Sequence, residues 1–407
     1  MQKPSIFFRI KDYFRTPRGI LVSMWIAFFL FMASVASFMP YSSLYYESLN
    51  LPGWQIGQLG SIRNLVAFTS SILLAFLTDV FRRRRLIMRV CILGMIAALL
   101  IFPHAASFAT LLPIVVLYSV FLAPTNSIIT ETTLSGLDNP RDYSTVRLGG
   151  SFGWGIVALI TGLLINNPDF GLPVIFPLHI FLLILLLAFS WLLPGARQAP
   201  GADKEIVSVK DVWDMLRLPV FLPWMVIIFL WGATESSISN FLFIHLKNQG
   251  GSPSLMGTAI SISIVGEIVA LAAAKRIQHK VGSRRMIVLS FVIRFIWFAA
   301  ASILKQPALI LINQFIGGTS FSLIHAGSVA YVNQRAPERI GTTAQAVRGA
   351  IQFGLGGGLG ALVSGALYQT YGSTALFRIM AFVSLVTFFL ALLLRAVDRA
   401  REKRAAL

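Results

Sequence analysis

The chain contains a long succession of apolar stretches, each about as long as a membrane-spanning helix. A helix needs about 20 mostly apolar residues to cross the hydrocarbon core of a bilayer. Twelve such stretches can be marked among the 407 residues, and each is a continuous apolar run instead of the short alternating segment of a barrel strand. The sequence therefore predicts an all-α membrane protein with twelve transmembrane helices. The stretches are residues 19–45, 55–78, 86–103, 108–133, 146–166, 174–193, 219–246, 254–274, 286–303, 308–333, 345–366 and 374–395.

The composition excludes several classes of soluble protein. Charged residues make up 12% of the chain and hydrophobic residues 56%, whereas a soluble domain is about 25% charged. A soluble enzyme, a disordered chain and a nucleic-acid binder are therefore excluded. The single cysteine, Cys91, rules out a disulfide framework and a cysteine metal cage. We expect no cofactor and no metal site.

The basic residues are distributed unevenly between the loops. All but two of the loop Lys and Arg residues, Lys247 and Lys305, fall on the side that carries both chain ends, the Arg82–Arg85 run and the Arg284-Arg285 pair. Basic loops stay in the cytoplasm. The chain is therefore expected in the inner or plasma membrane, as a multi-pass protein with both termini cytoplasmic. The net charge of +18 then faces anionic lipid headgroups of the bilayer.

Two halves of the chain resemble each other at an offset of about 200 residues, which indicates an internal duplication. Val146-Arg147-x4-Phe152-Gly153 recurs as Val347-Arg348-x4-Phe353-Gly354, and the Arg84-Arg85 pair recurs as Arg284-Arg285. We therefore expect two six-helix halves related by a pseudo-twofold axis along the membrane normal. The predicted parts are an N-terminal half at 1–193, a cytoplasmic linker at 194–218, a C-terminal half at 219–395 and a basic tail at 396–407.

Glycine is abundant in the two helices that carry the repeated motif. The stretch 146–166 and the stretch 345–366 both contain glycines at close intervals. Small residues allow helix backbones to approach closely in lipid. We expect these glycines to serve helix packing in preference to direct contact with a substrate.

Several charged residues fall inside the predicted membrane helices, where they need a partner or a function. At 1.5 Å per residue from the nearest cytoplasmic charge, Glu267, Arg294 and His325 lie about 12, 13.5 and 15 Å deep. An acid, a base and an imidazole at one level are typical of ion and proton pathways. Glu131 and Arg147 lie about 10 and 9 Å deep on a predicted hairpin, so they could form an ion pair. Structural ion pairs remain the alternative for any single pair.

The motifs also match a known family. The chain resembles the branch of the major facilitator superfamily that contains lactose permease, the nucleoside–proton symporters and the phenylpropionate-type transporters. The resemblance covers essentially the whole chain. It rests on Asp79 followed by Arg82–Arg85, on Pro124-Thr125-Asn126-Ser127, on Tyr143-x3-Arg147-x2-Gly150-x2-Gly153-Trp154, and on Gly266-Glu267, Arg294 and His325.

The resemblance implies roles for particular side chains. Arg147 and Trp154 match the arginine that binds sugar in lactose permease and the tryptophan that stacks on the sugar ring. We assign substrate binding to Arg147, Trp154, Glu131, Asn126, Arg294 and His325. Proton coupling is assigned to Glu267 and His325, and gating at the cytoplasmic surface to Asp79, Arg82 and Arg85.

The chain departs from lactose permease at one position. There a glutamate follows the histidine by three residues and carries the coupled proton, but here that position is Ser328. The phenylpropionate-type branch also keeps the histidine without that acid. Lactose is therefore not the expected substrate, and Glu267 is the best candidate for the coupling acid.

The favoured function is proton-coupled uptake of a small organic solute. An aromatic or organic acid suits the slight excess of deep arginines, because arginine binds carboxylate bidentately; nucleosides and sugars remain nearly as plausible. Drug or metabolite efflux on the same fold is the second interpretation. A membrane enzyme or lipid scramblase is the third, although no HExxH or P-loop motif occurs in the sequence. The expected partners are the solute, protons and the bilayer, without nucleic acid, and we expect a monomer.

Overall fold

A computed structural model of the chain describes residues 13–14, 16–81, 83–137, 139, 142–193, 221–336 and 341–405. The described part of each predicted apolar stretch falls mostly on helical segments, and none of the described residues forms a strand. The all-helical prediction is therefore confirmed for the described part of the chain. Nine helical segments in that part are long and apolar enough to cross a membrane.

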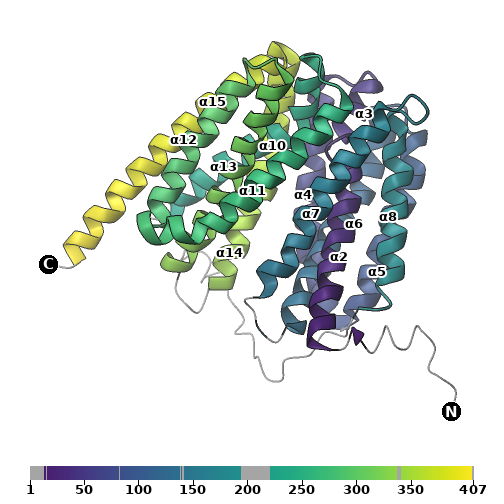
Figure 1. Cartoon of the computed structure of the whole chain (residues 1–407), viewed down its shortest axis with the longest axis horizontal. Helices are drawn as coiled ribbons and strands as arrows, with labels where there is room; N and C mark the ends of the chain where they lie inside the picture. Colours follow the sequence, from purple (N-terminus) through teal and green to yellow (C-terminus); the bar gives the residue numbers. More distant parts are fainter. Residues whose placement is uncertain are drawn as a thin grey trace. The chain divides into compact units, whose positions relative to one another are not determined.

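Within each run of described residues the helices follow one another with short connections (Figure 1). Two of their boundaries have a clear local cause. Helix α15 contains one residue outside helical geometry, Gly372 with φ 78°, which divides the last two predicted stretches. Gly282 with φ 80° separates two other helices, because a positive φ suits glycine and ends a helix. The helices are α2 (Pro17–Phe38), α3 (Ser42–Ser48), α4 (Gly53–Phe81), α5 (Arg84–Ile101), α6 (Phe108–Gly136), α7 (Tyr143–Asn166), α8 (Ile175–Phe189), α10 (Phe221–Asn248), α11 (Pro253–Val281), α12 (Ser283–Ala301), α13 (Pro307–Arg335), α14 (Gly341–Gly349), the π-helix η5 (Ala350–Gly356) and α15 (Gly357–Ala405).

The chain divides into two compact units. The first unit comprises residues 1–49 and 66–203, and the second comprises residues 50–65 and 204–407. Helix α4 is thus shared, with its first residues grouped in the second unit. The predicted linker at 194–218 lies outside the described residues.

In the first unit, α2 packs closely against α7. A methyl group added at Gly149 would meet the backbone oxygen of Trp25, and one added at Gly153 would meet that of Phe29. These two positions of α7 therefore accept only glycine without a shift of the backbone, which supports the packing interpretation of the glycines. At the other end of this unit, Phe38 lies at the centre of an aromatic cluster with Phe102, Tyr118, Phe176 and His179.

In the second unit, α10 packs against η5 and α15 through glycines. A methyl group at Gly232 would meet the backbone oxygen of Gln352, and one at Gly360 would meet the backbone of Ala233. The beginning of α4 belongs to the same packing, since Gly57 lies against Gly365 of α15. Each contact brings two helix backbones together, as is typical of helices associating in lipid.

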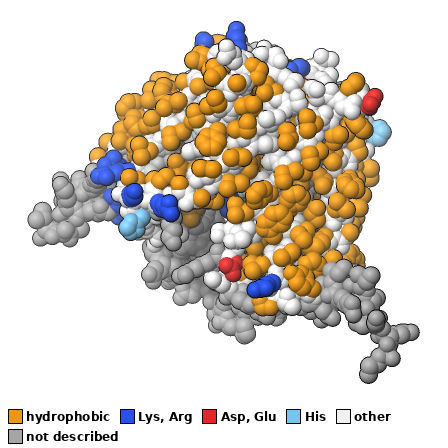
Figure 2. Space-filling model, in the orientation of Figure 1, with side chains coloured by type: hydrophobic (Ala, Val, Ile, Leu, Met, Phe, Trp, Pro, Cys, Tyr) orange, Lys and Arg blue, Asp and Glu red, His pale blue; other side chains and the backbone are white. Residues whose placement is uncertain are grey.

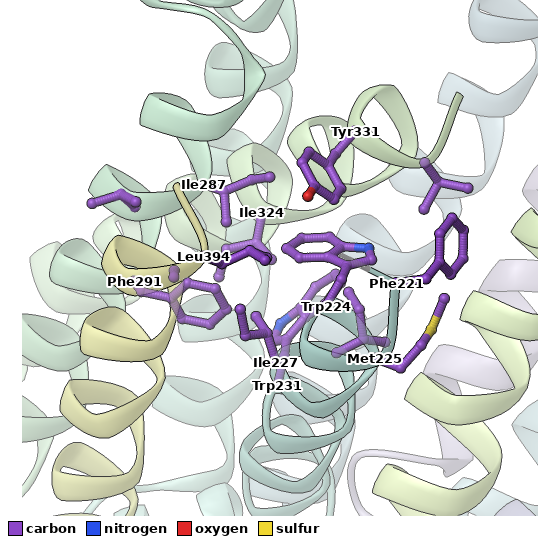
Figure 3. Close-up of a cluster of buried hydrophobic side chains, with 14 of the residues drawn as sticks. Phe221, Trp224, Met225, Ile227, Trp231, Ile287, Phe291, Ile324, Tyr331 and Leu394 are labelled. Atoms are coloured by element: carbon purple, nitrogen blue, oxygen red, sulfur yellow. The ribbon is translucent and has the colours of Figure 1, made fainter. Parts of the chain in front are cut away.

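The core of the second unit is rich in aromatic side chains. Figure 3 shows the ring of Tyr331, from α13, next to the ring of Trp224, from α10. The centroids of these two rings lie 4.6 Å apart. Trp231 lies further along α10. Phe221, Trp224 and Trp231 come from α10 and are almost completely buried. The core therefore fixes α10, the helix that also carries an internal acid.

The exterior is apolar, as a membrane protein requires. Large hydrophobic side chains such as Ile303, Phe382 and Leu393 are each more than 60% exposed. On the face drawn in Figure 2, hydrophobic side chains cover most of the surface, and Lys and Arg side chains lie near its edges. An exposed apolar surface of this extent marks contact with lipid or with a partner.

Candidate functional site

The second unit contains a buried ion pair. Arg294 of α12 is 2% exposed, and its Nη2 lies 2.7 Å from Oε2 of Glu235 on α10. The Nε of the same guanidinium donates to Thr234 Oγ1 at 3.1 Å, and its Cζ lies 5.3 Å from the Phe298 ring centroid. Consecutive residues of α10 thus hold the arginine from one side. In such a pair each partner supplies the other's counter-charge.

This arrangement differs from the expected cluster of Glu267, Arg294 and His325. Arg294 is directed at α10, so its acid partner in the described part of the chain is Glu235 and not Glu267. Glu267 on α11 is half-buried, and its backbone oxygen accepts from Ser322 Oγ at 3.0 Å. His325 on α13 stacks on Phe321, with centroids 6.0 Å apart. The depth estimate gave height along the helix axes, but the direction around each axis decides which side chains meet.

A second buried arginine lies where α14 meets the π-helix. Arg348 is 6% exposed, and its Nε donates to Oε1 of Gln345 at 2.9 Å. Its Nη1 donates to Oε1 of Gln352 at 3.0 Å. Gln345 in turn donates to the Val329 backbone oxygen and to Asn333 Oδ1, both on α13. The guanidinium is therefore held in one orientation by two amide oxygens, and the first of these amides is itself anchored to α13.

The second unit contains a third buried arginine. Arg63 of α4 is 6% exposed and donates from Nη2 to Asn240 Oδ1 at 3.1 Å. Asn240 is held by its own bonds to Ser236 on the preceding turn of α10. Among the described residues, the three buried arginines therefore all belong to the second unit. They are Arg63, Arg294 and Arg348.

The first unit places its charges differently. Glu131 of α6 pairs with Arg84 of α5, with 2.7 Å between Oε1 and Nη2, so the expected Glu131–Arg147 pair is replaced. Arg147 is exposed near the start of α7, and Trp154 and Asn126 are half-buried. Arg84 and not Arg147 pairs with Glu131 because α5 packs closely against α6, whereas α7 makes few contacts with α6.

Comparison with known proteins identifies the family. The family model described as MFS_1 like family matches residues 21–379, which is most of the chain. The chain belongs to the MFS_1 like family. It is therefore a membrane transporter of the major facilitator superfamily and not an enzyme.

Relatives of this MFS_1-like transporter cover nearly its whole length. It is 25% identical over 381 residues to the probable 3-phenylpropionic acid transporter of Escherichia coli (strain K12). The matched region covers 90% of this chain and 96% of that protein. It is 24% identical over 379 residues to the maltose permease of Geobacillus stearothermophilus, which spans 91% and 94%. A crystal structure of the nucleoside transporter NupG superposes with a TM-score of 0.81 at 18% identity and covers 92% of this chain and 98% of the other. That likeness shows the fold.

The predicted gating residues of the transporter are only partly described. Arg82 lies outside the described residues, as does the side chain of Asp79 near the end of α4. Arg85 is half-buried in the first turn of α5. Their gating role stays a prediction. Among the described residues, no three His, Cys, Asp or Glu side chains lie close enough to hold a metal ion.

Glu235 and Arg348 are charges inside predicted helices, but neither of them was predicted to belong to the site. The sequence contains no signal for the partner of Glu235. For Arg348 a signal was present, because Gln345 and Gln352 stand three residues before and four after it. Residues at those spacings lie on the same helix face.

Proposed function

We propose that this transporter is a proton-coupled symporter that takes up a small organic solute by alternating access. Twelve membrane-spanning helices in two related halves, with both termini in the cytoplasm of a bacterial inner membrane, belong to this proposal. The observation that carries it is the buried pair between Glu235 and Arg294. An ionisable pair at membrane depth in a transporter is a natural place for a proton to enter the cycle.

The chemistry of the pair supports coupling. Protonation of Glu235 removes its negative charge and leaves Arg294 attracted only by the Thr234 hydroxyl among its described polar partners. An arginine that is 2% exposed cannot turn to bulk water, so losing its counter-charge favours a different conformation. A proton that changes the balance between two conformations can drive solute against its gradient.

The solute class follows from the relatives and from the first unit. The names of similar proteins point to an aromatic acid, a sugar or a nucleoside. Arg147, Trp154, Asn126 and Glu131 are proposed to bind the solute, since a guanidinium, an indole and an amide can recognise any of these classes. In the second unit, Arg294 and His325 are also proposed to bind the solute.

The first experiment identifies the coupling acid. Glu235→Gln, Glu267→Gln and Glu131→Gln are reconstituted into vesicles, and a panel of aromatic acids, nucleosides and sugars is screened by counterflow. Uphill uptake driven by a pH gradient is then compared with equilibrium exchange of the transported solute. We expect Glu235→Gln to abolish accumulation while exchange persists, because glutamine mimics the protonated acid.

The two other variants serve as comparisons. Glu131→Gln should bind the solute more weakly but should keep the response of uptake to a pH gradient, since its acid is proposed to contact the solute and not to carry the coupled proton. Accumulation by Glu235→Gln together with its loss in Glu267→Gln would return the coupling role to Glu267. If wild-type protein shows exchange but no response to a pH gradient, the chain is a uniporter and the proton-coupled proposal is wrong.

A further inference from the structure

Arg348 is oriented so that a charged ligand can be recognised next to it. It donates to two amide oxygens, that of Gln345 on the preceding turn and that of Gln352 on the following turn. The first amide is itself fixed by two acceptors on α13. A guanidinium held in this way keeps its planar fork in one direction, as bidentate recognition of a carboxylate requires.

The second amide has an unsatisfied donor. Because Oε1 of Gln352 accepts from Arg348, the amide nitrogen Nε2 must point away from the guanidinium. Gln352 has no exposed surface, and its Nε2 bonds no atom of the described part of the chain. Turning the amide over would place its NH2 group against the arginine, donor against donor. The arginine therefore fixes a buried N–H donor that calls for an acceptor.

A further donor comes from the helix that packs on this segment. Trp231 of α10 is fully buried, and its indole Nε1 also lacks a bond to any described atom. The next residue, Gly232, lies directly against the backbone of Gln352. The Trp231 ring packs in the same apolar cluster as Val347 and Ile351, which flank the arginine and the glutamine. An indole can only donate, so this donor also lacks an acceptor.

The local backbone is unusual at the same place. Gln352 lies in the π-helix η5, Ala350–Gly356. π-helices are rare and occur frequently at functional sites. Phe321 and His325 of α13 lie beside Trp231, with ring centroids 5.9 and 6.3 Å from the indole. Two aromatic rings of α13 thus lie beside the indole that carries the unsatisfied N–H donor.

From these contacts we infer that Arg348 and the Gln352 amide form a subsite for the carboxylate group of the transported solute. The guanidinium binds both carboxylate oxygens, one of which also accepts from Gln352 Nε2, and the apolar body of the acid lies toward the half-buried ring of Phe321. This inference rests on the proposed transport function and narrows the solute class to monocarboxylates. It is independent of the residue that carries the proton.

The experiment measures binding in detergent, where no proton gradient is needed. The probes are benzoate and 3-phenylpropionate, each compared with its uncharged amide, and the readout is the thermal shift together with quenching of tryptophan fluorescence. The wild-type protein should bind each acid at least about tenfold more tightly than the matching amide, because a charge-assisted bidentate contact is lost in the amide. Equal binding of acid and amide, or binding of neither acid, would overturn the subsite.

Three substitutions separate this subsite from a structural role. Arg348→Lys keeps the charge but loses the fork, and should weaken acid binding at least about tenfold. Gln352→Glu places a carboxylate where the ligand's is expected, so it should abolish acid binding and raise the melting temperature of the ligand-free protein. Gln352→Leu removes the donor and should weaken acid binding; unchanged binding would mean that water satisfies Nε2, against the proposal. The control Arg378→Lys, at an exposed arginine of α15, should bind like wild type.

The outcomes also distinguish this inference from the proposed function. If acids bind selectively but no pH gradient drives their uptake, the subsite stands and proton coupling fails. If vesicles accumulate a sugar or nucleoside while no acid binds, transport stands and the carboxylate subsite is wrong.

Discussion

Two arginines in the repeated motif have opposite surroundings. Arg147 of α7 is exposed and makes no hydrogen bond or ion pair with another described residue, whereas Arg348 of α14 is buried and bonded to two glutamines. The positions that flank Arg147 at the same spacings are Ser144 and Ser151. Neither of these serines forms a hydrogen bond with Arg147 in the described part of the chain. A shared motif therefore fixes the arginine's place in the chain, while residues on the neighbouring turns decide whether it is held.

The ion pairs of the two units show the same contrast. The Arg84–Glu131 pair of the first unit has side chains 26% and 40% exposed, and the Arg294–Glu235 pair of the second has side chains 2% and 22% exposed. Solvent therefore screens the first pair more strongly than the second. The difference indicates that the second unit uses its charges for tasks that need a desolvated site, and it leads to graded predictions for stability.

The largest effect is expected from the buried pair. Glu235→Ala should lower the free energy of unfolding by about 3–5 kcal/mol, because Arg294 would stay buried without its counter-charge. Glu131→Ala should cost at most about 1 kcal/mol. Both are measured by SDS titration in mixed micelles. The double variant Glu235→Leu/Arg294→Leu should recover much of the loss, and equal losses in the two single variants would remove the contrast between the units.

The next effect comes from making the second motif like the first. Gln345→Ser/Gln352→Ser replaces both amides around Arg348 by the residues found around Arg147, and should cost about 2–4 kcal/mol through two lost hydrogen bonds to a charged group. The same titration measures it. Ser151→Ala in the first unit is the matched control and should change stability little. An unaltered double variant would show that the amides do not hold the arginine.

Glycine packing should give an intermediate effect. Gly153→Ala places a methyl group against the Phe29 backbone oxygen and should cost about 1–3 kcal/mol by overpacking. Gly349→Ala has nothing within 4 Å and helical backbone angles, so it should be neutral or stabilising by up to about 1 kcal/mol. Thermal melts in detergent compare the two, and a stabilising Gly153→Ala would contradict the close approach of α2 and α7.

The smallest effect on stability is expected at Arg147. Arg147→Lys should change the free energy of unfolding by less than about 0.5 kcal/mol, because the side chain is exposed. Uptake of the transported solute should nevertheless fall strongly, since lysine lacks the bidentate fork. Uptake assays in vesicles decide this, with melts as a check on folding. Near-normal uptake would leave Arg147 without a role in substrate binding.

The sequence predicted the helices well because membrane helices can be recognised from their length and apolar composition. It also predicted the packing role of Gly149 and Gly153, since small residues at a helix interface have one dominant use in lipid. These are properties of a single helix or of one helix face. They do not depend on how several helices are rotated against each other.

The partners of the internal charges depend on such rotations, and there the sequence was less informative. Depth placed Glu267, Arg294 and His325 at one level, but Arg294 faces Glu235 on another helix. Likewise, the hairpin argument favoured Arg147 for Glu131, whereas Arg84 binds it from the helix that packs more closely. The π-helix was not predicted, because its extra residue per turn arises where η5 lies against Gly232 and not from local propensity.

The π-helix also decides how a change of length in this part of the chain would be accommodated. A π-helix needs about one more residue per turn than an α-helix, so the seven residues of Ala350–Gly356 turn the chain about as far as six α-helical residues would. Deleting one residue there would let the segment become α-helical while Gly356 and Gly360 stay against the backbone of α10. A deletion further along α15 has no such compensation and would turn the residues after it by about 100°. Relatives that lack one residue in the π-helix should therefore keep their small residues on the same face of this helix.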